Sequence, residues 1–118
     1  MAPDGDNWFR VDNFSAHVTS GDDGSVIVSL AGEFDLSTAE DLRETLVGSE
    51  VLDAPQVRID LSELTFLDST GIGLLVAACK RVRNAGGTFS VNCGLGPVPR
   101  RVLEAAGLIE YLDVEDAV

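Results

Sequence analysis

The chain has 118 residues, of which 45% are hydrophobic and 24% are charged, a composition that fits one globular domain with one core. Its formal net charge of −12 disfavours nucleic acid and anionic lipid as partners. No apolar run approaches the roughly 18 residues that span a membrane. The N-terminus also lacks a secretory pattern, so we expect a cytoplasmic protein with no membrane contact.

The N-terminal part of the sequence predicts a tail followed by a hairpin. Residues 1–12 are rich in Asp, Gly, Asn and Pro, so we expect a flexible N-terminal tail and a domain over residues 13–118. The sequence GDDG at 21–24 has turn chemistry and separates two β-prone runs. It predicts a hairpin with strands near 14–19 and 25–31.

A helix and a strand are predicted next. Ser37 and Glu40 form a capping box, in which each side chain satisfies a backbone amide at the start of a helix. That helix carries apolar residues on one face and ends near Gly48. The segment VRIDL at 57–61 alternates between apolar and polar residues, which predicts a strand.

The second half continues the alternation of helices and strands. The apolar segment that starts at Gly71 predicts a helix stopped by the glycines at 86–87, and TFSVNC at 88–93 predicts a strand. Prolines open a further helix that ends at Gly107, and LIEYLDV at 108–114 predicts a last short strand. The whole order predicts an α/β domain with a mixed, mostly parallel β-sheet. An N-terminal hairpin and about three to four packing helices complete it.

Enzymatic chemistry finds little support in the sequence. The chain has no GxxxxGK[ST] loop for phosphates and no GxSxG nucleophile turn. Its sole histidine, His17, lies on a predicted hairpin strand, and without a base Ser69 is not an activated nucleophile. Cys79 and Cys93 lack redox or zinc spacing, so we interpret them as small buried side chains and keep a regulatory disulfide between them as a hypothesis. We expect no enzyme, no cofactor and no metal site.

Three polar residues, Asp68, Ser69 and Thr70, interrupt an apolar stretch where a strand gives way to a helix. A helix cap is the first interpretation of Asp or Ser at such a junction, but two successive hydroxyls exceed what one cap needs. A phosphate on Ser69 would face free helix amides. The helix that follows carries no charge from Gly71 to Cys79. This pattern indicates either burial from both sides or an exposed apolar patch for a protein partner.

Three segments together carry a family pattern: GEFDLSTAEDLRETL, VRIDLSELTFLDSTGIGLLVAACKRVRNAGG and VLEAAGLIEYL. They resemble the STAS domains of bacterial anti-sigma factor antagonists, and the similarity runs from about Gly24 to Asp113. The N-terminal extension with Trp8 and Phe9 departs from the family pattern, and so does the near absence of a C-terminal helix.

The resemblance implies a STAS domain that binds an anti-sigma factor of the ATP-dependent Ser/Thr kinase type and frees a sigma factor, as in bacterial stress responses controlled by partner switching. The kinase would phosphorylate Ser69, with Thr70 as second choice, and so end the binding. A metal-dependent Ser/Thr phosphatase would restore it, and Asp35 would contact the kinase. The implied partner-binding surface comprises Asp35, Asp68, Ser69, Thr70, Gly71, Ile72, Gly73, Leu74 and Leu75.

A second hypothesis comes from a different class of protein. The chain would then be a STAS scaffold or a transporter-accessory subunit that never cycles through phosphate. A stable large assembly or a complex with a membrane transporter would favour it. Under the first hypothesis we expect a monomer or a weak dimer.

Overall fold

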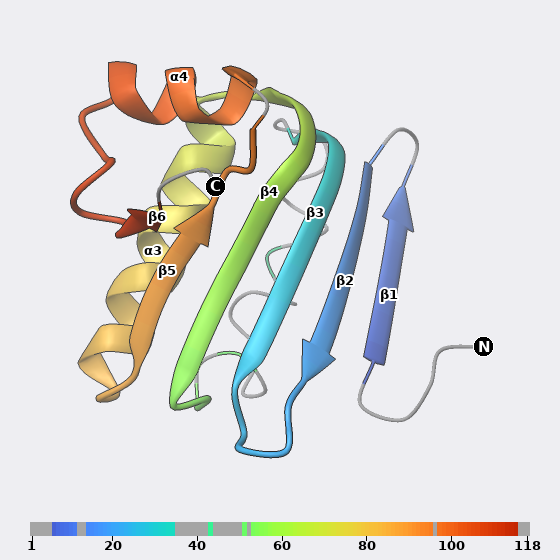
Figure 1. Ribbon diagram of the computed structural model, residues 1–118, viewed down its shortest axis with the longest axis vertical. Coiled ribbons are helices and arrows are strands. Elements are labelled where there is room, and N and C mark those ends of the chain that lie inside the picture. The colour runs from blue at the N-terminus through green and yellow to red at the C-terminus, as the bar shows by residue number, and fades with distance from the viewer. Residues whose placement is uncertain are drawn as a thin grey trace.

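The structure, a computed structural model, describes residues 6–11, 14–34, 43, 51, 53–95 and 97–115. These residues form one six-stranded sheet in which the strands lie side by side in sequence order (Figure 1). The elements are β1 (Asp6–Val11), β2 (Phe14–Ser20), β3 (Val26–Phe34), β4 (Gln56–Leu67), α3 (Ser69–Asn84), β5 (Thr88–Asn92), α4 (Pro97–Ala105) and β6 (Val114–Glu115). The first three strands pair antiparallel and the last four pair parallel, so the predicted mixed α/β architecture is confirmed.

The predicted hairpin is confirmed as β2 and β3. The amide of Gly21 donates to the carbonyl oxygen of Ser25 at 2.8 Å, which closes the turn. Gly24 has a φ of 85°, a conformation that glycine adopts without steric penalty. The Asp23 carboxylate accepts from the Ser25 amide at 3.0 Å, so this acidic residue of GDDG stabilises the turn itself.

The expectation of a flexible tail over residues 1–12 is not met by the part that the structure describes. Residues Asp6–Val11 form β1, which pairs antiparallel with β2 from Asp6 opposite Thr19 to Val11 opposite Phe14. Aromatic and β-branched residues favour strands, and the segment NWFRV contains three of them. The backbone of the outer edge of β2 forms hydrogen bonds with this segment. A prediction from local sequence alone does not take such a distant pairing partner into account.

The strand predicted at 57–61 is longer than expected, since β4 continues to Leu67. Two register shifts against β3 each place one extra residue on β4. They change the spacing of buried residues from two to three, so that Leu61, Leu64 and Leu67 all point into the core. Buried and exposed residues alternate regularly only as far as Leu61. The predicted strand ended at that residue for this reason.

The two predicted helices in the second half are confirmed as α3 and α4. The helix predicted from Ser37 to Gly48 lies outside the described residues, apart from the helical Arg43. Two helices are therefore bounded within the described residues, against the three to four expected for the whole domain. No helix among these residues is long and apolar enough to cross a membrane.

The last strand was predicted at 108–114, and this is wrong for most of its length. Residues 109–113 form turns, and β6 contains only Val114 and Glu115. Arg83 at the end of α3 holds this turn, because its guanidinium donates to the carbonyl of Tyr111 at 2.6 Å and lies 5.4 Å from the centre of the Tyr111 ring. Glu115 accepts a bidentate ion pair from Arg58 of β4, which ties β6 across β5.

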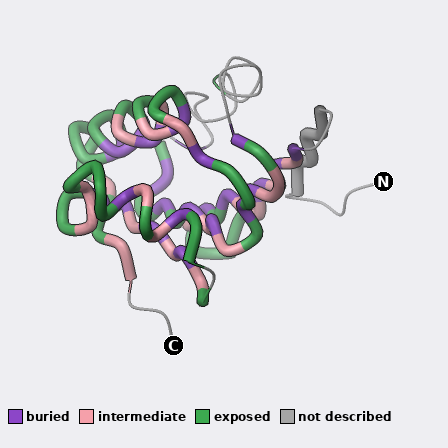
Figure 2. Tube along the Cα trace, turned by 90° about the horizontal axis from the view of Figure 1, so that it is seen from above, coloured by how far each residue is buried: buried purple, intermediate pink, exposed green. Residues whose placement is uncertain are grey.

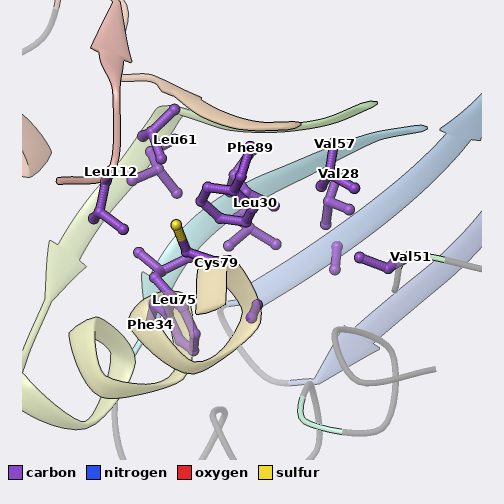
Figure 3. Close-up of a cluster of buried hydrophobic side chains, with 14 of the residues drawn as sticks. Val28, Leu30, Phe34, Val51, Val57, Leu61, Leu75, Cys79, Phe89 and Leu112 are labelled. Carbon is purple, nitrogen blue, oxygen red and sulfur yellow. The ribbon is translucent and has the colours of Figure 1, made fainter. Parts of the chain in front are cut away.

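The core lies between α3 and one face of the sheet. Leu75 and Cys79 project from α3 toward Leu30 and Phe89 of the sheet (Figure 3). Buried stretches face the interior and exposed stretches lie outside (Figure 2). Phe34, at the end of β3, is fully buried and stacks on Phe14 with 5.3 Å between ring centres. The end of β3 is therefore anchored beside the start of α3.

Candidate functional site

The polar triplet stands at the carboxyl end of the parallel strands, where β4 ends and α3 begins (Figure 1). The amide of Asp68 donates to the carbonyl oxygen of Phe34 at 3.4 Å. This bond joins the ends of β3 and β4 just before the helix. Open α/β sheets place their sites at this edge, because loops there are positioned by several strands at once.

Asp68 is the N-cap of α3, as capping chemistry predicted. Its backbone is extended, with φ −113° and ψ −176°, and one carboxylate oxygen accepts from the amides of Thr70 at 3.0 Å and Gly71 at 3.1 Å. Its carbonyl accepts from the amide of Ile72 at 3.0 Å, the first bond of the helix. Two helix amides that would otherwise lack a partner are thus satisfied by one carboxylate.

Ser69 and Thr70 are the first two residues of α3, and both side chains are exposed. Because Asp68 caps the helix, neither hydroxyl is needed for that purpose. The two hydroxyls are therefore surplus to the local structure and accessible to another protein.

The first two turns of α3 have an inner and an outer side, which divides the predicted partner-binding surface. Gly71 and Leu75 are buried and belong to the core, so they cannot contact a partner while the domain stays folded. Ile72 and Leu74 are half-buried against the core, and Gly73 is exposed. The sequence left two alternatives for this helix, burial from both sides and an exposed apolar patch. Neither holds for the whole helix, because one side packs in the core and the other side is open to solvent.

The two glycines of this helix have opposite environments. A Cβ on Gly71 would lie 2.9 Å from Cδ1 of Leu67 and 3.2 Å from the Phe34 ring, which is closer than side chains tolerate. Gly71 therefore lets α3 approach the ends of β3 and β4. A Cβ on Gly73 would meet nothing within 4 Å.

Asp35, the predicted acidic contact to a partner, lies outside the described residues. Its neighbour Phe34 is hydrogen-bonded to Asp68, so the chain leaves β3 directly beside the site. Sequence reasoning missed Phe66, which is 46% exposed and pairs with the exposed Glu33 of β3. In the sequence, only its position two residues before Asp68 could have pointed to Phe66. Its outward direction could not be predicted, because the register shifts in β4 decide which side chains face outward.

Cys79 and Cys93 are free and buried, as expected for small apolar side chains. Burial raises the pKa of both thiols, while Arg83 partly opposes this for Cys79 and Arg100 for Cys93. Thiols with a raised pKa are poor nucleophiles at neutral pH. Within the described parts of the chain, no three His, Cys, Asp or Glu side chains gather where they could hold a metal ion.

Known proteins provide a comparison for this arrangement. Residues 15–118 match the STAS domain family model. An anti-sigma-B factor antagonist of Listeria monocytogenes is 32% identical over 104 residues, covering 88% of this chain and 90% of that protein. The anti-sigma-F factor antagonist RsfB of Mycobacterium tuberculosis is 37% identical over 89 residues, covering 72% and 68% respectively. A crystal structure of an anti-sigma factor antagonist from Mycobacterium paratuberculosis has a TM-score of 0.77 at 32% identity, covering 89% of this chain and 87% of that one.

The mixed sheet, the capped helix at its carboxyl edge and the family match over residues 15–118 define a STAS domain. The family match extends from β2 to the C-terminus, while β1 lies outside it. The chain belongs to the STAS domain family, which confirms the resemblance noted in the sequence. The relatives described above are, by name, antagonists of anti-sigma factors.

Proposed function

We propose that this chain is an anti-sigma factor antagonist whose binding is controlled by phosphorylation of Ser69. In the unphosphorylated form it binds a cytoplasmic anti-sigma factor that is also a Ser/Thr kinase, and the sigma factor is released. The observation that carries the proposal is the exposed Ser69 at a helix start already capped by Asp68, in a chain with anti-sigma factor antagonists as relatives.

The phosphotransfer uses ATP bound by the kinase. The hydroxyl oxygen of Ser69 attacks the γ-phosphorus, the bond from that phosphorus to the β–γ bridging oxygen breaks, and ADP leaves. The hydroxyl proton passes to a base of the kinase. Ser69 is the substrate in this step and needs no base of its own, in agreement with the lack of a nearby histidine in the sequence.

The phosphate on Ser69 weakens binding of the anti-sigma factor through the negative charge that it adds at the contact surface. It adds about −1.5 to −2 charges next to Asp68, whose carboxylate already occupies the amides of Thr70 and Gly71. The new charge therefore finds no free donor among these two amides. Burying it against the uncharged surface of α3 carries a desolvation penalty that a modest interface does not offset. We expect loss of binding without a large change of fold.

A metal-dependent Ser/Thr phosphatase restores the binding form. Water attacks the phosphorus of phosphoserine, the bond to the Ser69 oxygen breaks, and inorganic phosphate leaves. The exposure of Ser69 supports this step as well, because the phosphatase needs the same access as the kinase.

A test uses two purified probes, the anti-sigma-B factor of Listeria monocytogenes and the anti-sigma-F factor of Mycobacterium tuberculosis. Each is mixed with the full chain and Mg-ATP, binding is measured by calorimetry, and the phosphorylated residue is identified by mass spectrometry. We expect binding to at least one probe and phosphate on Ser69. Ser69→Ala should bind without being labelled, and Ser69→Glu should bind at least about tenfold more weakly, which corresponds to 1.4 kcal/mol.

Two outcomes contradict the proposal. One is the absence of binding to either probe, and the other is Ser69→Glu that binds as tightly as the wild type. A STAS scaffold that does not cycle would bind its partner with or without ATP and carry no phosphate on Ser69 or Thr70.

A further inference from the structure

The two edges of the sheet differ in how much strand they expose. At one edge β6 contains only Val114 and Glu115, and the guanidinium of Arg83 donates to the carbonyl of Phe89 on the neighbouring β5 at 3.3 Å. At the other edge β1 runs over Asp6–Val11 and pairs with β2 without a register shift (Figure 1). Short edges discourage pairing with another chain, whereas a regular edge strand offers a template for it. The edge at β1 is therefore the one suited to a further strand.

The hydrogen-bond pattern of the β2–β3 hairpin determines which backbone groups of β1 point to this edge. The amide of Gly21 donates to the carbonyl of Ser25, so these two residues form a hydrogen-bonded pair at the end of the hairpin. Hydrogen-bonded and non-hydrogen-bonded pairs alternate along an antiparallel ladder, so the odd-numbered residues of β2 bond to β3 and the even-numbered ones bond to β1. The even-numbered residues of β2 pair with odd-numbered residues of β1. The backbone amides and carbonyls of Asp6, Trp8 and Arg10 therefore point to the free edge.

The residue types at these three positions form a self-complementary pattern. Positions 6, 8 and 10 share one face of the sheet, because successive residues of a strand alternate between faces. It is the face away from the core, since Trp8 pairs with His17, and Ala16 beside His17 is buried. If two copies of β1 pair antiparallel about a two-fold axis at Trp8, Asp6 of each copy stands opposite Arg10 of the other. Opposite charges at facing positions stabilise a sheet, and like charges destabilise it.

We propose that a second copy of this chain pairs with β1, antiparallel and edge to edge, so that the two sheets become one continuous sheet with its two-fold axis at Trp8. In this register the outward-pointing backbone groups of the two copies meet, and both charge pairs form at once. The two-fold axis makes the interface the same patch on both copies, so the assembly closes at two subunits. Because one strand of each copy takes part, the interface is small and the dimer forms at high protein concentration.

This inference does not rest on the proposed function. The strand β1 lies outside residues 15–118, over which the family model matches. Two strands, β2 and β3, separate β1 from β4, at whose end Ser69 lies. The edge at β1 is therefore a separate surface from the candidate site, and variants at this edge should leave binding of an anti-sigma factor unchanged.

Exchange of the two charges tests the interface and its register. We compare the wild type, Asp6→Arg, Arg10→Asp and Asp6→Arg/Arg10→Asp by sedimentation equilibrium of the full chain from about 1 µM to about 1 mM. The wild type should dimerise within this range. Each single variant places like charges opposite one another at two places, so its association constant should fall by about tenfold or more. The double variant should dimerise like the wild type, and an equimolar mixture of the two single variants should form heterodimers.

A matched control separates the facing charges from net charge. Arg101 is exposed on α4, and Arg101→Asp changes the net charge by the same amount as Arg10→Asp. Arg101→Asp should dimerise like the wild type. Thermal unfolding shows that each variant is folded, and recovery of the dimer in the double variant shows that neither substitution acts by unfolding β1.

Amide hydrogen exchange, followed by NMR, reports on the strand pairing itself. The amides of Trp8 and Arg10 point to the free edge in the monomer. They should exchange about tenfold more slowly once about nine tenths of the chain is dimeric, because exchange then occurs through the remaining monomer. The amides of Phe9 and Val11 bond to β2, so their exchange should be the same at low and high concentration.

Three results would overturn the inference. The first is a chain that stays monomeric over the whole concentration range. The second is a dimer whose association constant is the same in both single variants as in the wild type, or falls equally in Arg101→Asp. The third is a dimer in which the amides of Trp8 and Arg10 exchange as fast as in the monomer, which would place the contact on another surface.

Discussion

One oxygen of the Asp68 carboxylate accepts the amide of Gly71 at 3.1 Å, and the same oxygen accepts the amide of Thr70 at 3.0 Å. This relationship makes Asp68, the residue before the proposed phosphate acceptor Ser69, a structural residue. Under the proposed function its charge acts on a partner, but its carboxylate oxygen first caps the helix.

Replacing Asp68 by alanine should therefore destabilise the domain. The loss of an N-cap side chain lowers the free energy of unfolding by about 0.5–2 kcal/mol. Asp68→Asn is the control, because asparagine caps helices about as well as aspartate. Urea denaturation of the three proteins checks this, and equal midpoints for wild type and Asp68→Ala would contradict the assigned cap.

The paired substitutions Gly71→Ala and Gly73→Ala should have opposite effects on stability. A methyl group at 71 meets Leu67 and Phe34, and overpacking of this kind lowers the free energy of unfolding by about 1–3 kcal/mol. A methyl group at 73 meets nothing, so the better helix propensity of alanine should stabilise by up to about 1 kcal/mol. Thermal unfolding of the two variants and the wild type measures these changes in stability. A change of the same sign in both variants would refute the assignment of Gly71 to the inner side and Gly73 to the outer side of α3.

Phe66 should contribute to partner binding rather than to stability. Its side chain is 46% exposed next to the site, and aromatic side chains supply much of the binding energy at protein interfaces. Phe66→Ala should weaken binding of the anti-sigma factor by about tenfold, or 1.4 kcal/mol, with little change in thermal stability. Ile27→Ala is the control, since Ile27 is 39% exposed near the start of β3, far from the site along that strand. Unchanged affinity in Phe66→Ala would exclude this residue from the interface.

The two cysteines should make the domain less stable at high pH. Burial raises the pKa of both thiols above the ordinary value of 9.0, so the fold favours the neutral form. The stabilisation is complete below the pKa of the unfolded chain and is lost as the pH rises through the higher pKa of the folded state. Urea unfolding between pH 7 and pH 10 should show this fall, and Cys79→Ala/Cys93→Ala should show less of it.

The same burial bears on the disulfide hypothesis. Protonated, buried thiols should react slowly with a thiol reagent in the folded protein and rapidly in urea. Intact mass after mild oxidation, with and without reductant, then distinguishes two cases. A regulatory disulfide between Cys79 and Cys93 would appear as a reducible mass difference in the folded protein, whereas inert core thiols would give none.

The features that the sequence predicted are those that depend on nearby residues. The Asp68 cap, the turn at Gly24 and the helix after the prolines are all set by chemistry within a few positions. The ends of β4 and the existence of β1 depend on pairing with a distant strand, and local patterns do not contain that information.

The structure places some of the predicted site residues as the sequence suggested and others differently. Ser69 and Thr70 are exposed at a helix start, as the triplet indicated, but Leu75 belongs to the core and Phe66 was overlooked. Whether an apolar helix residue faces inward depends on where the helix lies on the sheet. In the same way, Gly71 and Gly73 look alike in the sequence and differ only once α3 is placed.

The two extra residues that β4 carries between Asp60 and Leu67 affect the direction in which the strand delivers its end. A bulge of this kind bends a strand and increases its local twist. Deleting one residue at a register shift would remove that bend and leave the letters Asp-Ser-Thr intact, so β4 would present the start of α3 in a different direction. Under the proposed function, spacing along β4 therefore sets the aim of Ser69 as much as the residues around it do.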